Sequence, residues 1–333
     1  MGRQLRFFES NCIQFVTCRC FQGRFLMRPS HEVNQLIGGV LVKAMDRQPA
    51  IKVYAFNFLS NHFHMLLAGP ESDPCSIAAF IGYVKINIAR AVGRVHHWRG
   101  SFFERRYSAE PVLDDGALVE RVRYTFLNGV KEGLVERVED WPGLTSLPEH
   151  RGRVREFAWY DRTAWHKAGR TGEIPKTLYQ MRVAPLEFND PKSAVDSARL
   201  IAGIVKDINT NAATYRGDKP VLGKAGILAQ DPHAAPRKPE RSPRPTCHVS
   251  GTKKERADAI KKHKEKYKAF EARYQVAAEK TLIGDGRAEY PEHCFRPVLP
   301  ANWKIVAIPL EKPIMIRLEK TEYGYAGTWE VLK

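Results

Sequence analysis

Hydrophobic residues recur along the first part of the chain with two periods, the two-residue period of a strand and the longer period of an amphipathic helix. Strand patterns cover Cys12–Phe21, Ile51–Phe58, His62–Ala68 and Tyr107–Leu113. Helical patterns cover Glu32–Met45, about Cys75–Val95 and about Gly116–Val130. The order strand, helix, strand, strand, helix, strand is that of a ferredoxin-like fold. We therefore expect an α+β domain in which helices pack on one face of an antiparallel sheet.

Beyond this part the periodic patterns weaken, and changes in composition divide the chain into four segments: residues 1–150, 151–231, 232–252 and 253–333. The second segment is expected to form a mixed, mainly helical extension with a helix over Ser193–Ile208. The third is rich in proline and arginine and predicts a linker or extended arm. The last predicts a basic helix over Lys253–Lys280 and a β-like tail with Ile305–Ile308 and Ile314–Leu318. A basic, partly helical C-terminal extension is thus expected to follow the first domain.

Charge is unevenly distributed along the 333 residues, whose net charge is +16. Residues 1–150 contain 18 lysines and arginines against 15 aspartates and glutamates, a net +3, so residues 151–333 carry the remaining +13. A basic field of this size attracts polyanions and speeds their capture. Nucleic acid is therefore favoured as the partner over a small neutral metabolite.

Two sequence features bear on the cellular location. No apolar run approaches the roughly 20 residues that span a bilayer, and charges interrupt the N-terminal segment MGRQLRFFESN. The six cysteines include no CxxC pair. We expect reduced thiols, no membrane association and a cytoplasmic, nucleoid-associated location.

Two histidines alternate with a phenylalanine in the third predicted strand. The strand period places the imidazoles of His62 and His64 on one face, while Phe63 points to the opposite layer. Two neighbouring imidazoles supply half of a metal site, although an HxH pattern also occurs incidentally. A metallo-β-lactamase pattern would require an acidic residue where Leu66 stands, and the next acid, Glu71, comes too late for a cupin.

The helix that follows Asp114 and Asp115 contains a second candidate pair. Tyr124 and Asn128 are four residues apart and so lie on one helical face, one turn from each other. A phenol and an amide in this arrangement can approach the same metal and phosphate, whereas the alternative is a core tyrosine beside a surface asparagine. Tyr107 is a rival nucleophile, but it has no polar neighbour four residues on and looks more like a core residue.

Three segments occur at the spacing of one known family: Tyr54–Leu67 (YAFNFLSNHFHMLL), Trp98–Tyr107 (WRGSFFERRY) and Tyr124–Val135 (YTFLNGVKEGLV). Over residues 5–148 the chain resembles the REP-associated tyrosine transposases and their single-tyrosine insertion-sequence relatives. These are HUH endonucleases on a ferredoxin-like fold. The chain departs from the pattern at Leu59-Ser60, where relatives have Met-Pro, and at Gly129, where relatives have proline. Neither departure removes a chemical group.

The resemblance implies a set of roles. His62 and His64 are the ligands of a divalent metal, Mg²⁺ or Mn²⁺, Asn128 stands at the position of a third polar ligand, and Tyr124 is the nucleophile. The substrate is single-stranded DNA, folded into hairpins from palindromic repeats, and the intermediate is a 5′-phosphotyrosine. One phosphodiester replaces another in this reaction, so no nucleotide cofactor is needed, and the sequence has no GxxxxGK(S/T) loop. Both a monomer and a homodimer are compatible with the sequence.

Six residues near these motifs are candidates for DNA contacts because they carry groups that bind phosphates or stack on bases: Arg105, Arg106, Arg121, Arg123, Trp98 and Phe102. For the two arginines of the helix, a solvated helix face is an equal alternative. For the phenylalanine, the alternative is a place in the core.

Two other classes of function compete with a transposase. One is a binding protein, derived from a transposase, that holds hairpin DNA or RNA without cutting it; the intact candidate residues argue against it. The other is a relaxase or replication-initiator nickase, which usually carries helicase or primase segments. The sequence contains no such segment.

Overall fold

The structure is a computed structural model that describes residues 5–9, 12–189, 196–236, 246–285, 287–296, 314–321 and 324–331. By its internal contacts the chain forms two compact units. One comprises Phe8–Glu265, and the other comprises Met1–Phe7 with Lys266–Lys333. The candidate residues all lie in the first unit.

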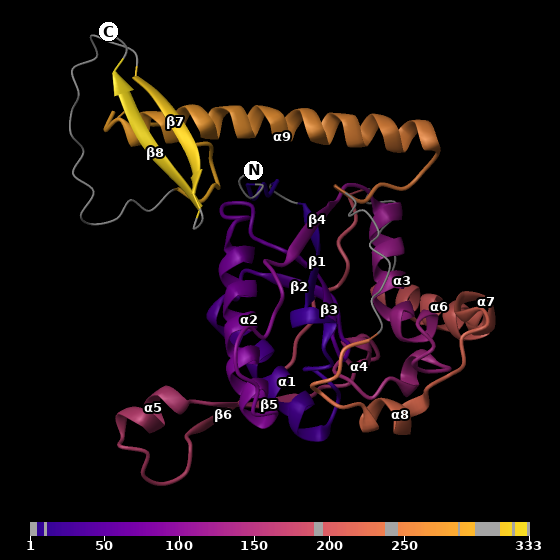
Figure 1. Cartoon of the computed structure of the whole chain (residues 1–333). Helices are drawn as coiled ribbons and strands as arrows, with labels where there is room; N and C mark the ends of the chain where they lie inside the picture. Colours follow the sequence, from indigo (N-terminus) through magenta and orange to yellow (C-terminus); the bar gives the residue numbers. More distant parts are fainter. Residues whose placement is uncertain are drawn as a thin grey trace. The chain divides into compact units, whose positions relative to one another are not determined.

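A four-stranded antiparallel sheet is the centre of the first unit (Figure 1). Its strands are β1 (Ile13–Arg19), β2 (Lys52–Phe58), β3 (His62–Ala68) and β4 (Ser108–Val112). Their order in the sheet is β2-β3-β1-β4. With α1 (His31–Arg47) after β1 and α2 (Ser76–Val95) after β3, this is the ferredoxin-like topology that the sequence predicts. The prediction of the fold class is confirmed.

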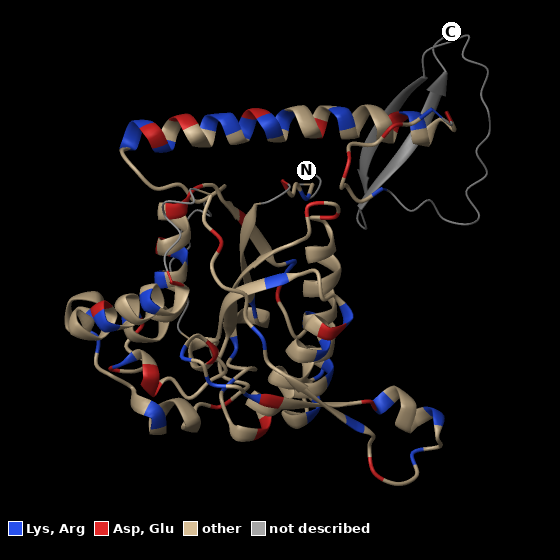
Figure 2. Cartoon of the chain, turned by 180° about the vertical axis from the view of Figure 1, so that it is seen from behind, with Lys and Arg blue, Asp and Glu red and all other residues tan. Residues whose placement is uncertain are grey.

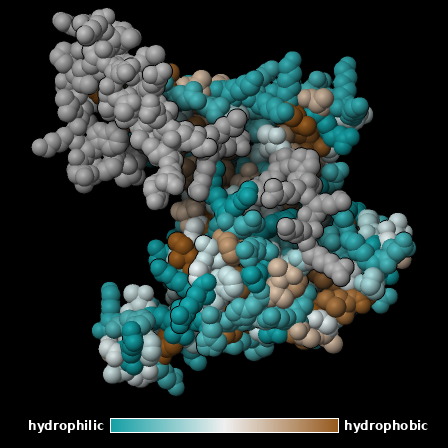
Figure 3. Space-filling model, in the orientation of Figure 1, coloured by the Kyte–Doolittle hydropathy of each residue, from teal (hydrophilic) through white to brown (hydrophobic). Residues whose placement is uncertain are grey.

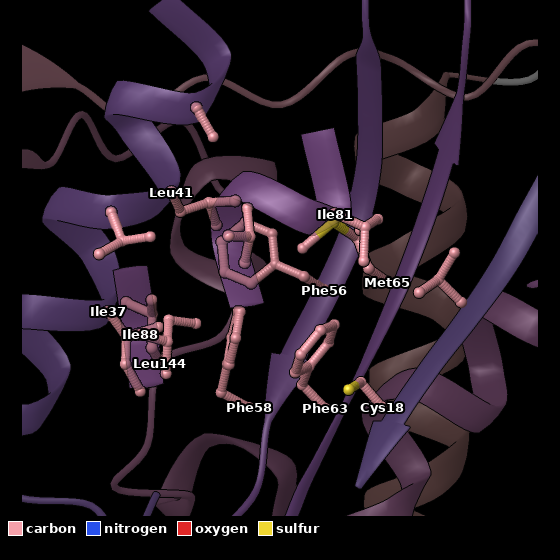
Figure 4. Packing of buried hydrophobic residues seen from close by; sticks show 14 of the residues in the cluster. Cys18, Ile37, Leu41, Phe56, Phe58, Phe63, Met65, Ile81, Ile88 and Leu144 are labelled. Atoms are coloured by element: carbon pink, nitrogen blue, oxygen red, sulfur yellow. The ribbon is translucent and has the colours of Figure 1, made fainter. Parts of the chain in front are cut away.

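Helices α1 and α2 cover one face of the sheet. Every second strand residue points to them, and the phenylalanine and methionine side chains of β2 and β3 pack with those of the two helices (Figure 4). Of the helical residues, Ile37, Leu41, Ile81 and Ile88 are fully buried. By length and composition α2 would be long enough to cross a membrane, but its apolar residues Ile77, Phe80, Ile81, Val84 and Ile88 belong to this core.

The opposite face is covered as well, which corrects the expectation of helices on one face only. Phe15, Tyr54 and Leu66 alternate with the residues of the first face and are apolar, so this face too must be shielded from water. The shield is α3 (Asp115–Lys131), which begins at the N-cap Asp114 and packs against α6 (Ser197–Thr210). Shorter elements complete the shell: η1 (Phe21–Gly23), η2 (Val138–Asp140), α4 (Leu147–His150), α7 (Ala212–Arg216) and α8 (Gly223–Ala229).

A two-stranded arm leaves the first unit beside α1 and α2. It consists of β5 (Glu156–Tyr160), α5 (Arg162–Lys167) and β6 (Lys176–Gln180), and its far end projects from the unit in Figures 1 and 3. The base is fixed to α1 at Gly38 and Gly39, because a Cβ atom on either residue would overlap the Phe157 ring or the Ala158 carbonyl. The arm is therefore anchored to the helical layer by close backbone approach.

Part of the proline- and arginine-rich segment is packed, which the sequence does not predict. Residues 237–245 lie outside the described residues, but Cys247 and His248 are buried. His248 forms a parallel bridge with Val112, and its backbone amide donates to the Pro111 carbonyl at 2.8 Å. The end of the segment thus extends the sheet at the edge of β4.

The predicted basic helix is α9 (Lys253–Leu282). In the second unit the ring of Phe7 packs on Tyr267 and Phe270, with centroid distances of 6.1 and 5.0 Å. A hairpin of β7 (Ile314–Thr321) and β8 (Gly324–Val331) confirms the predicted strand at Ile314–Leu318. Ile305–Ile308 lies outside the described residues.

We predict that His150 makes the first unit sensitive to mild acid. Burial lowers the pKa of its imidazole from 6.5 to about 4, so between these values the unfolded chain binds more protons than the folded one. Stability is therefore lost as the pH falls from 6.5 to 4, by about 3 kcal/mol in total. Urea unfolding at pH 7 and pH 4 should show this extra loss in the wild type and not in His150→Leu. Parallel losses in the two proteins would contradict the prediction.

Candidate active site

The two histidines of β3 face α3, and the residue between them faces the other layer. Phe63 is fully buried in the core formed with α1 and α2, whereas the His64 ring packs on Phe15 and Tyr124 on the opposite side. The rings of His62 and His64 are 4.8 Å apart between centroids. The strand alternation predicted from the sequence is confirmed.

Hydrogen bonds to the two Nδ1 atoms orient both imidazoles. The Nδ1 of His62 donates to the Asn61 side-chain oxygen at 2.7 Å, and the Nδ1 of His64 lies 2.9 Å from the Thr17 hydroxyl oxygen. A histidine that donates from Nδ1 carries its lone pair on Nε2. Nε2 of His62 is thereby prepared to act as a ligand or acceptor, and so is Nε2 of His64 in the tautomer whose Nδ1 donates to the Thr17 hydroxyl. Second-shell partners give metal-binding histidines this arrangement.

The two Nε2 atoms converge on the side chain of Asn128. The Asn128 amide nitrogen lies 3.0 Å from Nε2 of His64 and 3.4 Å from Nε2 of His62. On β2, Asn57 pairs with His64 and donates to the Thr125 carbonyl at 3.0 Å, which fixes α3 above the strand. The Nε2 atoms of His62 and His64 and the Asn128 amide thus surround one position between β3 and α3.

This donor set fits a divalent cation. The Asn128 side-chain oxygen is buried and has no hydrogen-bond partner among the described residues. The amide nitrogen faces the two Nε2 atoms, and a half-turn of the amide would bring the oxygen to them as a third ligand. Two imidazoles and one amide oxygen leave coordination positions open for a substrate oxygen and water. The described residues contain no cluster of three or more His, Cys, Asp or Glu side chains, so no competing site of that type occurs among them.

Both imidazoles are neutral at pH 7. Burial lowers the pKa of His62 to about 3, with a further decrease caused by the charge of Arg19. The pKa of His64 is also lowered, first by burial and then by His62, Arg19 and Arg121. A neutral imidazole is the form that binds a metal, because the ligand atom must be free of its proton.

Tyr124 is half-buried beside His64, with its ring edge-on at a centroid distance of 5.2 Å. Burial raises the pKa of its hydroxyl, and the charges of Arg121 and Arg19 oppose this effect. The hydroxyl is therefore protonated at neutral pH and must lose its proton if it acts as a nucleophile.

A cation lies over the tyrosine ring. The guanidinium carbon of Arg121 is 5.1 Å from the Tyr124 ring centroid and 5.6 Å from that of Phe15. Its Nε is buried and has no hydrogen-bond partner within the described part of the chain. This leaves a donor of Arg121 available next to Tyr124.

Tyr107, the rival nucleophile, lies on the other side of the sheet. It is 8% exposed and belongs to the core formed with α1 and α2, whereas His62, His64 and Tyr124 face α3. A hydroxyl in that core cannot reach the two Nε2 atoms without a change of fold. The geometry therefore groups Tyr124, and not Tyr107, with the histidines.

The structure places the other candidates for DNA contacts in different surroundings. Phe102 is 4% exposed and packs in the core, so it has no free face for stacking, whereas its neighbour Phe103 is partly exposed. Arg123 forms an ion pair with Asp207 of α6. The assignment of Phe102 to a DNA contact is corrected, because it is a core residue. Arg123 is partly exposed and joins α3 to α6, and its contact with DNA stays a prediction.

Three candidates remain accessible. Arg105 and Arg106 are exposed in the loop before β4. This loop lies beside the end of β1, because the Glu104 amide donates to the Arg19 carbonyl at 3.0 Å. Trp98 is half-buried, and the Arg24 guanidinium lies 5.5 Å from its ring centroid. None of the three contacts the histidine pair.

Two functional groups at the site are missed by sequence reasoning. Arg19 pairs with His62 across β1 and β3 and is exposed at the end of its strand. Glu110 on β4 accepts hydrogen bonds from the Ser108 hydroxyl at 2.7 Å and from His248 Nε2 at 2.8 Å, and the His248 ring lies edge-on to Phe15 at 5.4 Å. These groups come together only through the pairing of β1 with β3 and of the segment around His248 with β4. No local sequence pattern predicts this pairing.

Comparison with known proteins gives one relative by sequence. A REP-associated tyrosine transposase of Haemophilus influenzae is 31% identical over 97 residues, which cover 26% of this chain and 54% of that protein. The chain thus spans about half the length of this curated relative. No family model matches the chain.

Two solved structures are similar at low identity. A REP-associated tyrosine transposase bound to a REP hairpin is 20% identical, with a TM-score of 0.40, and the match covers 46% of this chain and 87% of that one. A transposase of Deinococcus radiodurans is 16% identical, with a TM-score of 0.26, over 37% of this chain and 95% of that one. The sequence match bears out the resemblance of the motifs: over 97 residues this chain is similar to a REP-associated tyrosine transposase.

Proposed function

We propose that the chain is a metal-dependent transposase that nicks and rejoins single-stranded DNA at hairpin-forming repeats. The observation that carries the proposal is the convergence of His62 Nε2, His64 Nε2 and the Asn128 amide on one point, with the Tyr124 ring against His64. A metal-ligand set beside a phenol is the arrangement required for phosphoryl transfer to tyrosine.

The reaction balances without a nucleotide cofactor. The Tyr124 oxygen attacks the scissile phosphorus and loses its proton, and the bond to the 3′-oxygen of the upstream strand breaks, so that oxygen leaves as a 3′-hydroxyl. The downstream strand is held as a 5′-phosphotyrosine. Attack by a 3′-hydroxyl on this linkage restores a phosphodiester and the free tyrosine.

Each residue of the site has a distinct task. His62, His64 and Asn128 would hold a divalent cation, Mg²⁺ or Mn²⁺, which when bound neutralises charge on the phosphate oxygens. Arg121 lies over the Tyr124 ring, where its charge favours the phenolate, and its buried Nε has no hydrogen-bond partner among the described residues. Arg19, across from His62, adds a second positive charge at the same edge.

The test is a denaturing gel with single-stranded palindromic repeats from the source genome, labelled on one side of the nick at a time, with Mn²⁺ or with EDTA. We expect protein-linked label only from the strand 3′ of the cut, and only with the metal. Tight hairpin binding with no adduct for any repeat would favour a binding protein that has lost the chemistry.

A further inference from the structure

A basic surface lies where the arm meets the helical layer, on the side of the sheet away from the histidines. The Trp159 ring of β5 lies 6.1 Å from the Tyr83 ring of α2, and the guanidinium of Arg47 lies 5.1 Å from the Tyr83 centroid. Residues 153–182 contain seven lysines and arginines against three aspartates and glutamates. Figure 2 shows lysine and arginine along the outer side of α2 and on the arm.

Three arginines on this surface form a cluster. Arg90 and Arg94 are exposed and four residues apart on α2, about 6 Å along the helix axis, so they lie on one face. Arg162 is the first residue of α5 and comes three residues after Trp159, whose ring packs on Tyr83 of α2. Among the described residues, no carboxylate is in ion-pair contact with any of the three. Asp161 is next to the cluster, but its side-chain oxygen accepts the Ala164 amide as the N-cap of α5.

The mutual repulsion of these arginines has no evident structural purpose. The pKa of Arg94 is lowered, first by partial burial and then by the charges of Arg162 and Arg90. Like charges held close together without a counterion destabilise the fold, and a bound polyanion relieves the repulsion. With Arg90 and Arg94 exposed and none of the three arginines in an ion pair within the described part of the chain, their donors can bind a phosphate-bearing ligand.

We propose that Arg90, Arg94 and Arg162 form a second DNA-binding site, which holds the phosphate backbone of the duplex stem of a hairpin. This inference rests on the proposed function, because it assigns a place to the part of the substrate that the catalytic centre does not cut. The candidate catalytic residues face α3, whereas the cluster belongs to α2 and the arm. Neighbouring cations on two adjacent elements suit the high and regular charge density of a duplex.

The experiment compares the full-length wild type with the triple variant Arg90→Gln, Arg94→Gln, Arg162→Gln. Three lost phosphate contacts should lower the affinity for a stem-loop with a single-stranded tail by about 100-fold at 0.15 M salt, and lower the salt slope by about 3. Affinity for the tail alone should change much less. Adduct formation at saturating DNA should remain.

The control removes the same charge elsewhere, by Arg199→Gln, Lys206→Gln and Lys224→Gln on α6 and α8, whose side chains are exposed. Equal losses in the two triple variants would overturn the site in favour of a general basic field, and equal losses for stem-loop and tail would make it a single-strand site. Unchanged stem-loop affinity would also overturn it. Failure of the proposed function is separate, since it appears as absence of the adduct in the wild type.

Discussion

Tyr124→Phe is expected to form no covalent adduct with DNA while it binds hairpin DNA as the wild type does. The substitution keeps the ring that packs on His64 and Phe15 and removes only the hydroxyl, so the fold and the cation contact with Arg121 survive. Loss of the nucleophile should reduce strand cleavage by on the order of 10⁴-fold or more. The measurement is a denaturing gel with Mn²⁺ and DNA labelled 3′ of the nick, beside a binding titration.

Tyr107→Phe is the matched control, since it deletes the same atom from the opposite core. The adduct should persist, with at most a modest loss of stability, because Tyr107 packs with α1 and α2. An adduct that survives in Tyr124→Phe but disappears in Tyr107→Phe would reverse the assignment. If both variants retain it, the nucleophile is neither tyrosine.

The sequence predicts the strands and helices of the ferredoxin-like core well because their patterns are strong. Predicted and observed bounds of the third strand coincide at His62 and Ala68, and those of the first three helices differ by at most two residues at either end. The second helical layer is harder to foresee. Phe15 and Leu66 look like ordinary alternating strand residues, and only the assembled sheet reveals that both faces are apolar.

Part of the candidate site also follows from local spacing. Strand alternation places His62 with His64, and the helical repeat places Tyr124 with Asn128, but neither period predicts that the two pairs meet. Their contact at 3.0 Å depends on the packing of α3 onto β3. Spacing alone cannot predict such a contact, and only the family resemblance joins the two pairs.

DNA contacts are the least predictable part of the site when residue type is the only evidence for them. Arginine and phenylalanine serve ion pairs and cores as readily as nucleic acid, and Arg123 with Asp207 and Phe102 in the core show this. Arg19 was missed for the converse reason: its importance comes from the register that sets it across from His62. Pairing register between distant strands is not encoded in any short stretch of sequence.

Replacing both histidines, His62→Ala with His64→Ala, should abolish metal-dependent cleavage and leave hairpin binding almost unchanged. Two of the three candidate ligands would be lost, so we expect a decrease in cleavage of more than about 10³-fold, whereas the basic residues that bind the backbone remain. Mn²⁺ binding, measured by calorimetry on the protein without DNA, should disappear in the same variant.

Thr17→Val is a graded control, because it removes only the partner of His64 Nδ1 and should weaken metal affinity by about 10- to 100-fold. Circular dichroism and urea unfolding establish that the variants remain folded, since His64 is only 4% exposed and its truncation leaves a cavity. Undiminished, metal-dependent cleavage by a folded double variant would place the metal elsewhere, and Mn²⁺ binding lost without loss of cleavage would show that the site does not serve the chemistry.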